Sequence, residues 1–324
     1  MTKAIRIHEY GGPENLIWED VDTGQPGEGE VRLRQTAVGL NFIDVYQRSG
    51  LYPLGDLPKT LGMEAAGVIE DVGPGVDAFK PGDRVAYAMG LGSYAEERIM
   101  GTDKLVHLPD GIDDQSAAAM MLQGMTAHYL LRRTYKVQPG DTILIYAAAG
   151  GVGLIACQWA KHLGATVIGC VGSQEKADLA KANGCDHPIL YREENVPDRV
   201  REITNGEGVP VVYDSIGKAT FNDSIDCLAP FGLMVSFGNA SGPVDPINPA
   251  MLGPKGSLYL TRTTLATHTA TPELLLDGAN ALFDVVQDGH VKIAVNQTFP
   301  LSETAQAHVD LEARKTTGST VLLP

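Results

Sequence analysis

The run TILIYAAAGGVGLIACQWAKHL, residues 142–163, constrains the fold of this chain more than any other. An apolar, β-branched segment ends in a turn of alanines and glycines, and a helical pattern follows from Gly151 to Leu163. A strand that turns through glycine into a helix leaves unpaired backbone N–H groups at the helix start. Those groups and the helix dipole favour a phosphate, so the run predicts a phosphate-binding turn.

The pattern of strand-like and helical segments around this turn divides the chain into three parts. From residue 124 to 264, helical stretches alternate with six apolar runs: TILIYA, TVIGCV, HPILY, VPVVYDSIG, GLMVSFGN and GSLYLTR. That alternation predicts an α/β Rossmann domain with a doubly wound, six-stranded parallel sheet. Residues 1–123 carry strand-like runs broken by Gly and Pro, which predicts a β-rich domain. Residues 265–324 hold one helical pattern and terminal strand-like pieces.

The turn itself has the spacing Ala147-x-x-Gly150-x-x-Gly153, a relative of G-x-G-x-x-G. Gly/Ala turns also pack helices closely onto sheets, so the motif alone is a weak signal. Its place after the first strand of a βα series favours a dinucleotide. We therefore expect the backbone of Gly150, Gly151, Val152 and Gly153 to bind the pyrophosphate.

The end of the second strand indicates which dinucleotide is bound. An NAD enzyme places Asp or Glu about 20 residues past the glycines to hold the ribose 2′-OH. Here the strand ends in GCVGSQEK, with Gly172, Ser173 and Lys176 and no acid at the strand tip. Ser173 and Lys176 suit a 2′-phosphate, with the lysine as its point charge. A solvated surface lysine remains the alternative, although a cation sits poorly at a helix N-terminus. The pattern favours NADPH.

Composition excludes several other classes of protein. The formal net charge of −15 argues against nucleic acid as a partner. No apolar run approaches the roughly 20 residues of a membrane span, and the N-terminus does not resemble a signal peptide, so we expect a cytoplasmic protein. The four cysteines have no Cys-x-x-Cys pair and are expected to be buried thiols.

Four motifs carry a resemblance to a known family: GLNFIDVYQRSGLYP (39–53), LGMEAAGVIEDVG (61–73), AAAGGVGLIACQWAK (147–161) and GLMVSFGNASG (232–242). With them, the chain resembles the zinc-independent NADPH:quinone oxidoreductases, the zeta-crystallin-like branch of the medium-chain dehydrogenase/reductase superfamily. The resemblance implies a GroES-like (chaperonin-10-like) catalytic domain over 1–123 and an NADPH-binding domain over 124–264. It also implies that segment 265–324 returns to the catalytic domain.

The positions that hold catalytic zinc elsewhere in the superfamily are changed here. Cys, His and Cys of the zinc alcohol dehydrogenases correspond to Asn41, Met63 and, approximately, Gln123. Zinc prefers thiolate, imidazole or carboxylate, so we predict an enzyme without a metal.

The resemblance also implies site residues. Charge develops on a substrate oxygen during reduction, so hydrogen-bond donors should face that oxygen. The candidates are the Asn41 amide and the hydroxyls of Tyr46 and Tyr52, with Asp44 as an orienting acceptor; for the two tyrosines ordinary packing is an equal alternative. The cofactor contacts implied by the resemblance are, besides Lys176, Thr126, Tyr191, Phe237, Asn239, Ser241 and Arg314.

These observations predict an NADPH-dependent reductase of small quinones or similar electron-poor acceptors. A reductase of the C=C bond in unsaturated aldehydes or ketones is the alternative, and the electrons can pass as a hydride or singly. A non-enzymatic role, holding NADPH or RNA, is a third hypothesis that the −15 charge disfavours for RNA. The family usually forms homodimers through edge strands, and SLYLTR (257–262) is the candidate strand.

Overall fold

The computed structural model describes every residue from 1 to 324 and divides into two compact units. The first unit comprises residues 1–125, 269–287 and 293–324, and the second comprises 126–268 and 288–292. The boundary expected after residue 123 falls within a single helix, α2 (Asp114–Tyr129).

The second unit is built on a six-stranded parallel sheet with the order β11-β10-β9-β12-β13-β14. This arrangement confirms the predicted Rossmann fold. Its strands are β9 (Thr142–Tyr146), β10 (Thr166–Val171), β11 (His187–Leu190), β12 (Val209–Asp214), β13 (Leu228–Ser236) and β14 (Tyr259–Arg262). Its helices are α3 (Gly151–His162), α4 (Gln174–Ala182), α5 (Val196–Ile203), α6 (Phe221–Asp226) and α7 (Leu265–His268).

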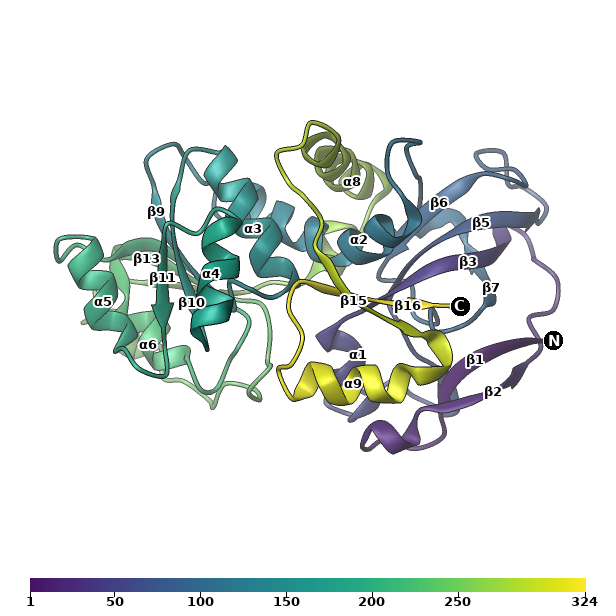
Figure 1. The fold of residues 1–324 in the computed structure, drawn as a ribbon, viewed down its shortest axis with the longest axis horizontal. Helices are drawn as coiled ribbons and strands as arrows, with labels where there is room; N and C mark the ends of the chain where they lie inside the picture. Colours follow the sequence, from purple (N-terminus) through teal and green to yellow (C-terminus); the bar gives the residue numbers. More distant parts are fainter. The chain divides into compact units, whose positions relative to one another are not determined.

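The strand order reverses its direction at β9, and this reversal places helices on both faces of the sheet. From β9 the chain steps outward through β10 to β11, and after β11 it crosses back to β12 on the other side of β9. Right-handed crossovers then put α3 and α4 on one face and α5 and α6 on the other (Figure 1). The central strands β9, β10 and β12 are buried on both faces, which accounts for their nearly continuous apolar runs.

The first unit contains two sheets. A three-stranded sheet has the order β2-β1-β4, and a seven-stranded sheet has the order β15-β16-β3-β5-β6-β8, with β7 also paired to β3. The strands are β1 (Thr2–Ile7), β2 (Ile17–Val21), β3 (Glu30–Leu40), β4 (Lys59–Thr60), β5 (Glu64–Val72), β6 (Arg84–Ala88), β7 (Glu97–Gly101), β8 (Leu105–His107), β15 (Val295–Pro300) and β16 (Ser319–Leu323). Helices α1 (Phe42–Arg48), α2, α8 (Pro272–Gln287) and α9 (Thr304–Glu312) complete the unit.

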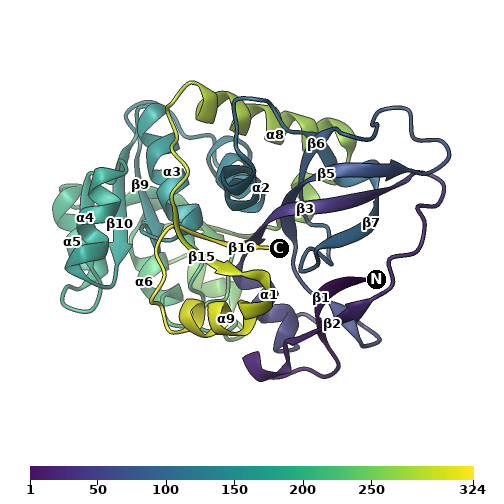
Figure 2. The ribbon, with the colours of Figure 1, turned by 45° about the vertical axis from the view of Figure 1, so that its right-hand side comes forward.

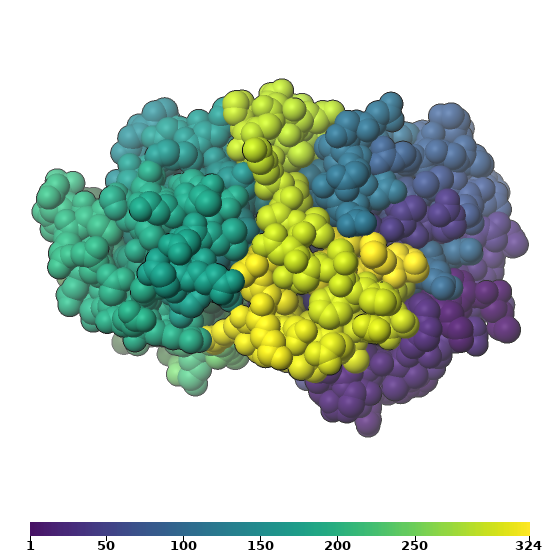
Figure 3. All heavy atoms as spheres, viewed as in Figure 1, coloured from purple at the N-terminus to yellow at the C-terminus, as the bar shows by residue number.

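The C-terminal residues complete the sheet that the N-terminal residues begin. Strand β16 pairs antiparallel with β3, and β15 pairs parallel with β16 (Figure 2). Helix α9 packs beside the N-terminal segment around residues 13–15, and the space-filling view shows C-terminal and N-terminal residues in contact (Figure 3). Leu33, Leu61, Leu301 and Leu322 share one buried core, so this unit is held together by residues from both ends of the chain.

All four cysteines are buried free thiols, as expected from their spacing. None of the helices is both long enough and apolar enough to cross a lipid bilayer.

Candidate active site

The turn between β9 and α3 has the geometry of a backbone cradle. Helix α3 begins at Gly151, and its N-cap, Gly150, offers no side chain to the first-turn amides. A Cβ placed on Gly153 would lie 2.2 Å from the carbonyl oxygen of Ala147, so only glycine fits there. Ala147 has a positive φ of 53°, a strained conformation that tends to occur at functional turns. The helix N-terminus can therefore receive an anion at close range.

The end of β10 lies beside Tyr191, which follows β11. A Cβ on Gly172 would meet the Tyr191 hydroxyl at 3.0 Å, so these two predicted cofactor residues are neighbours. The hydroxyl of Ser173 is the N-cap of α4 and accepts a hydrogen bond from the backbone N–H of Lys176 at 3.4 Å. The structure thus gives Ser173 a helix-capping role, and Lys176 stands in the first turn of the capped helix.

Two loops at the ends of β12 and β13 interlock through their backbones. The N–H of Phe237 donates to the Asp214 carbonyl oxygen at 2.9 Å, and a Cβ on Gly238 would lie 2.3 Å from the Ser215 carbonyl oxygen. The Ser241 hydroxyl donates to the carbonyl oxygen of Ile216 and accepts from the N–H of Ala219. The side chain of Ser241 therefore fastens this predicted nicotinamide loop.

The buried carboxylate of Asp214 fixes the first of these loops. It accepts from the N–H groups of Ile216 and Gly217 and from the hydroxyls of Thr220 and Ser224. Sequence reasoning did not single out this residue. Of the remaining predicted cofactor contacts, Asn239 follows in the second loop, Thr126 is buried in α2, and Arg314 belongs to the first unit.

In the first unit, the segment that carries the first family motif forms the end of β3 and helix α1. Gly39 is required there because its Cβ would meet the Ala118 carbonyl oxygen at 2.2 Å and Oε2 of Glu64 at 2.4 Å. Asn41 is the N-cap of α1, and its backbone N–H donates to Oδ2 of Asp44 at 2.8 Å. This is the N-cap-to-N3 bond of a capping box, which starts the helix and fixes the position of Asn41.

The side chain of Asn41 is the centre of a buried polar network. Its Nδ2 donates to Oε2 of Glu64 at 2.6 Å, and its Oδ1 accepts from Nε2 of Gln123 at 3.1 Å. Oε1 of Gln123 accepts from the hydroxyl of Ser319 at 2.6 Å, and Oε1 of Glu64 accepts from the N–H of Leu122 at 2.7 Å. Asn41 has two amide hydrogens, so this network leaves one of them for another acceptor.

Met63 completes the set of positions that correspond to zinc ligands elsewhere in the superfamily. Its sulfur accepts from Nε2 of Gln47 at 3.2 Å. Two amides and a thioether are poor zinc donors, and here each is engaged by a neighbouring side chain. The donor chemistry at these positions does not fit a zinc ion, and no group of three or more His, Cys, Asp or Glu side chains in the structure could hold a metal.

Burial shifts the pKa values of the two carboxyls beside Asn41. Desolvation raises the pKa of Glu64 to about 8, against the lowering effect of the hydrogen bonds from Asn41 and Leu122. Desolvation likewise raises the pKa of Asp44 to about 7, although hydrogen bonds from Asn41 N–H and Tyr94 favour its ionised form. The raised pKa therefore favours the neutral acid form of Glu64 at neutral pH.

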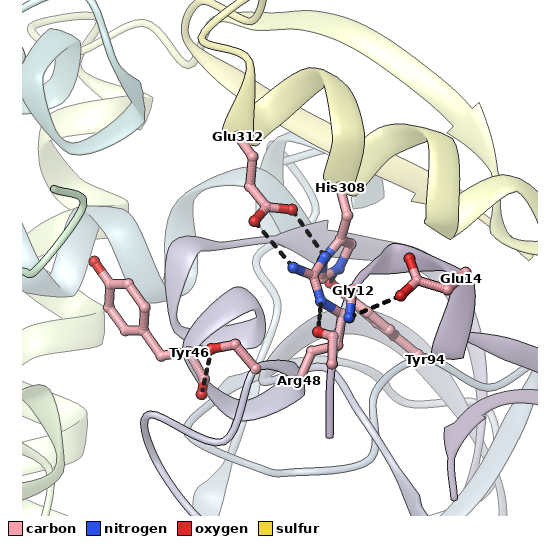
Figure 4. Close-up of polar contacts among 9 residues, drawn as sticks. Gly12, Glu14, Tyr46, Arg48, Tyr94, His308 and Glu312 are labelled. Carbon is pink, nitrogen blue, oxygen red and sulfur yellow. Dashed lines mark hydrogen bonds and ion pairs between the residues drawn. The ribbon is translucent and has the colours of Figure 1, made fainter. Parts of the chain in front are cut away.

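A second set of polar side chains extends from Asp44 toward the surface. The Tyr94 hydroxyl donates to Oδ2 of Asp44 at 2.8 Å, and it lies 3.1 Å from Nε2 of His308. Nδ1 of His308 lies 3.2 Å from Nη1 of Arg48, and Arg48 forms two 2.9 Å hydrogen bonds with Glu312 (Figure 4). Three elements, α1, α9 and the segment before β7, contribute these residues.

The two predicted tyrosines pack together. The rings of Tyr46 and Tyr52 are 5.2 Å apart in an edge-to-face arrangement, and the Tyr46 side chain points away from the Arg48–His308 cluster (Figure 4). Tyr46 is buried and Tyr52 is half-buried. Aromatic packing is thus established for both, and a donor role for their hydroxyls stays a prediction.

The network contains several residues that the motifs alone did not indicate. Glu64 stands inside the motif LGMEAAG, and the N-x-x-D pattern of Asn41 and Asp44 is a capping-box signal that could have located α1. Ser319 and His308 have no such signal, because they meet the site only through the return of the C-terminal segment.

Comparison with known proteins extends the picture. Residues 27–110 match the family model described as an alcohol dehydrogenase GroES-like domain, and residues 151–279 match that of a zinc-binding dehydrogenase. The chain is 57% identical to a quinone oxidoreductase of Pseudomonas aeruginosa and 49% identical to a 2-haloacrylate reductase of Burkholderia sp., covering all of this chain and 99–100% of each relative. A solved structure of Escherichia coli quinone oxidoreductase complexed with NADPH is 48% identical, with a TM-score of 0.98 over 99% of this chain and 100% of that one.

A parallel sheet with a glycine-lined helix start, joined to a GroES-like β unit, defines a two-domain reductase of the medium-chain dehydrogenase/reductase type. Within that superfamily, the chain belongs to the quinone oxidoreductase family.

Proposed function

We propose that this chain is a metal-independent enzyme that uses NADPH to reduce small quinones. The observation that carries the proposal is the 57% identity, over the full length of both chains, to a quinone oxidoreductase. The amide and thioether chemistry at Asn41, Met63 and Gln123 supports a mechanism without a zinc ion, and an acceptor that is already electron-poor requires no Lewis acid.

We assign the cofactor to the second unit. The uncapped start of α3 at Gly150–Gly153 supports binding of the pyrophosphate, and Gly172, Lys176 and Tyr191 support recognition of the 2′-phosphate. The loop that holds Phe237, Asn239 and Ser241 is proposed to contact the nicotinamide, and Thr126 and Arg314 remain proposed contacts by family resemblance. When bound, NADPH supplies the reducing equivalents.

The residues of the first unit are proposed to receive the acceptor. The Asn41 amide hydrogen that its neighbours leave over is the donor for the substrate oxygen, and the bonds to Glu64 and Gln123 hold the amide in place. Such a fixed donor stabilises the charge that develops on that oxygen. Asp44 orients the backbone of Asn41, and Tyr46 and Tyr52 form an aromatic wall suited to a flat ring.

The test is turnover followed at the NADPH absorbance. We expect 1,4-benzoquinone and a naphthoquinone to be reduced with NADPH, at rates that a chelator does not change. Oxidation of a simple alcohol with NADP⁺ that disappears with the chelator would contradict the absence of a catalytic metal. No oxidation of NADPH by any quinone would refute the proposed activity.

A second candidate function is reduction of an activated C=C bond. The 49% identity to a 2-haloacrylate reductase over the full chain favours it. The same assay distinguishes the two functions when 2-chloroacrylate and an unsaturated aldehyde are added as acceptors. If these compounds are reduced and quinones are not, the protein is a C=C reductase rather than a quinone reductase.

Replacing Lys176 by alanine is expected to weaken NADPH binding about tenfold or more, because one charge-assisted contact to the 2′-phosphate is lost. NADH binding should change little, since NADH lacks that phosphate. Lys181→Ala, in the last turn of the same helix, is the matched control. Fluorescence titration with both dinucleotides measures the effect, and equal losses for NADPH and NADH would exclude contact between Lys176 and the 2′-phosphate.

We also propose a homodimer that pairs the edge strand β14 with its copy. β14 is the last strand of its sheet, and Tyr259 on it is 60% exposed. Phe231 is 70% exposed and lies close by, since its N–H donates to the carbonyl oxygen of Gly256. An unpaired apolar edge is a site of association.

Light scattering at micromolar concentration should therefore give twice the chain mass of 34.5 kDa. Tyr259→Glu is expected to shift the protein toward the monomer, because it places a charge beside its own copy. Ile17→Glu, at an exposed apolar position on β2, is the control. A wild-type protein that is monomeric under these conditions would refute the dimer.

A cytoplasmic location is consistent with the four free thiols, because disulfides are rare in that compartment.

A further inference from the structure

Arg48, His308, Tyr94 and Asp44 form a buried row of hydrogen bonds in which every donor and acceptor is determined. A guanidinium donates and never accepts, so Nδ1 of His308 is the acceptor from Arg48, and the imidazole proton is on Nε2. That Nε2–H donates to the hydroxyl oxygen of Tyr94, whose own O–H then donates to Oδ2 of Asp44. Figure 4 shows where Arg48, His308 and Tyr94 lie, together with the hydrogen bonds from Arg48 to Glu312.

The packing around these residues leaves little room for another arrangement. Arg48 is 2% exposed, and the other three residues are fully buried. Two further residues hold Arg48 in place. It forms two hydrogen bonds with Glu312, and its Nε donates to the Gly11 carbonyl oxygen at 3.1 Å. Gly62 makes space for the Tyr94 ring, because a Cβ there would lie 2.3 Å from it.

The row of hydrogen bonds from Arg48 through His308 and Tyr94 cannot carry protons between Asp44 and the surface. Arg48 stands between His308 and the half-exposed Glu312, and a guanidinium does not release its proton in a protein. Burial, followed by the charge of Arg48, lowers the pKa of His308 to about 3, so the imidazole stays neutral. The row therefore acts by orientation alone.

Its inner end meets the proposed acceptor site. Oδ2 of Asp44 accepts only from Tyr94 and from the N–H of Asn41, while Oδ1 has no hydrogen-bond partner. We propose that Arg48, His308 and Tyr94 are positioning residues for the reduction: they fix Asp44 against the backbone of Asn41 and so set the place of the Asn41 amide. This inference rests on the proposed role of Asn41 as the donor to the acceptor oxygen.

The charged groups around Asp44 determine the expected pH effect. These groups come from four elements: Tyr94 from the segment before β7, His308 from α9, Arg48 from α1 and Glu64 from β5. The charge of Asp44 raises the pKa of Glu64. The Tyr94 hydrogen bond lowers the pKa of Asp44, so its removal must raise that pKa. As the pH falls, Asp44 then becomes protonated at a higher pH than in the wild type, and the ionised form that accepts the Asn41 N–H is lost there.

The direction of this row can be tested without any turnover. Long-range ¹H–¹⁵N spectra of the wild-type histidines, with His308→Asn to assign the signal, should show His308 protonated on Nε2 and neutral from pH 5 to 8. Arg48→Met should populate the tautomer with the proton on Nδ1. A wild-type His308 with its proton on Nδ1, or one that titrates near pH 6.5, would overturn the proposal.

The consequence for the reaction is tested by the pH profile of kcat for quinone reduction. In Tyr94→Phe we expect the acidic limb to move upward by about one pH unit, with the KM for NADPH unchanged. Tyr87→Phe removes another fully buried hydroxyl of the same unit, one bonded to Gln35, and should keep the wild-type profile.

Coinciding profiles for the two phenylalanine variants would overturn the positioning role. Should the wild type reduce no quinone, the proposed function fails on its own, and the tautomer of His308 still decides whether the directed row exists.

Discussion

Gly153→Ala is expected to weaken NADPH binding on the order of 100-fold, the equivalent of two charge-assisted hydrogen bonds. The added Cβ would lie 2.2 Å from the carbonyl oxygen of Ala147 and 2.8 Å from the carbonyl carbon of Ala148. Both are backbone atoms, so the whole turn must move and the first amides of α3 lose their alignment. Overpacking of this kind should also lower the free energy of unfolding by about 1–3 kcal/mol.

Gly150→Ala is the matched control for this substitution. Its Cβ would meet the Ala147 carbonyl oxygen at 3.3 Å, and its φ of −83° suits alanine. We expect a cost in unfolding free energy below about 1 kcal/mol, that of placing alanine at an N-cap. Isothermal titration with NADPH and thermal unfolding of the free protein measure both effects, and equal losses in the two variants would show that the approach to Ala147 does not control the turn.

The unfolding free energy of the protein is expected to fall as the pH rises from about 5 to 8. The pKa of Glu64 is about 8 in the folded protein and near its ordinary value of 4.5 in the unfolded chain, so over this interval the folded state binds the extra proton. Stability that depends on a raised pKa is fully present below the unfolded value and is lost as the pH passes through the folded one. With about 1.4 kcal/mol for each pKa unit, the loss is on the order of a few kcal/mol.

Glu64→Gln should make this pH dependence shallower, and the raised pKa of Asp44, about 7 in the folded protein, should retain part of it. Glutamine cannot titrate, but it accepts a hydrogen bond at only one of the two positions that face Asn41 and Leu122. The variant should therefore be less stable than the wild type at pH 5, and the difference should shrink toward pH 9. Glu70→Gln, an ion-paired position farther along β5, should retain the wild-type slope. The same pH slope in Glu64→Gln and in the wild type would mean that folded Glu64 does not have the raised pKa.

The Gly/Ala turn after β9 and the sheet behind it were predictable as structures because local residues determine them. The strand β9, the Gly/Ala turn and α3 are contiguous, and their burial on both sheet faces appears directly as apolar runs. The edge position of β14 followed from the strand order in the same way. Each of these features depends on neighbours within a few residues or on the alternation of strand and helix.

The buried polar network was not predictable on the same basis. Tyr94 and His308 are separated by 214 positions and Gln123 and Ser319 by 196, so no local pattern joins them. Asn41 was expected to donate to a substrate, yet the sequence does not reveal that Glu64 and Gln123 already engage most of its amide. A hydroxyl or an imidazole acquires such a role only when the fold brings its partner within bonding distance.

The pairing of β16 with β3 has a consequence for biosynthesis. Residues 126–268 form a nearly continuous unit, so the ribosome can release a foldable Rossmann domain while the sheet that contains β3 still lacks two of its strands. Strand β16 is almost completely buried, and Ser319 at its start supplies the hydroxyl that holds Gln123. The Rossmann domain can therefore fold before the sheet around β3 has all of its strands, although it is made after most of that sheet.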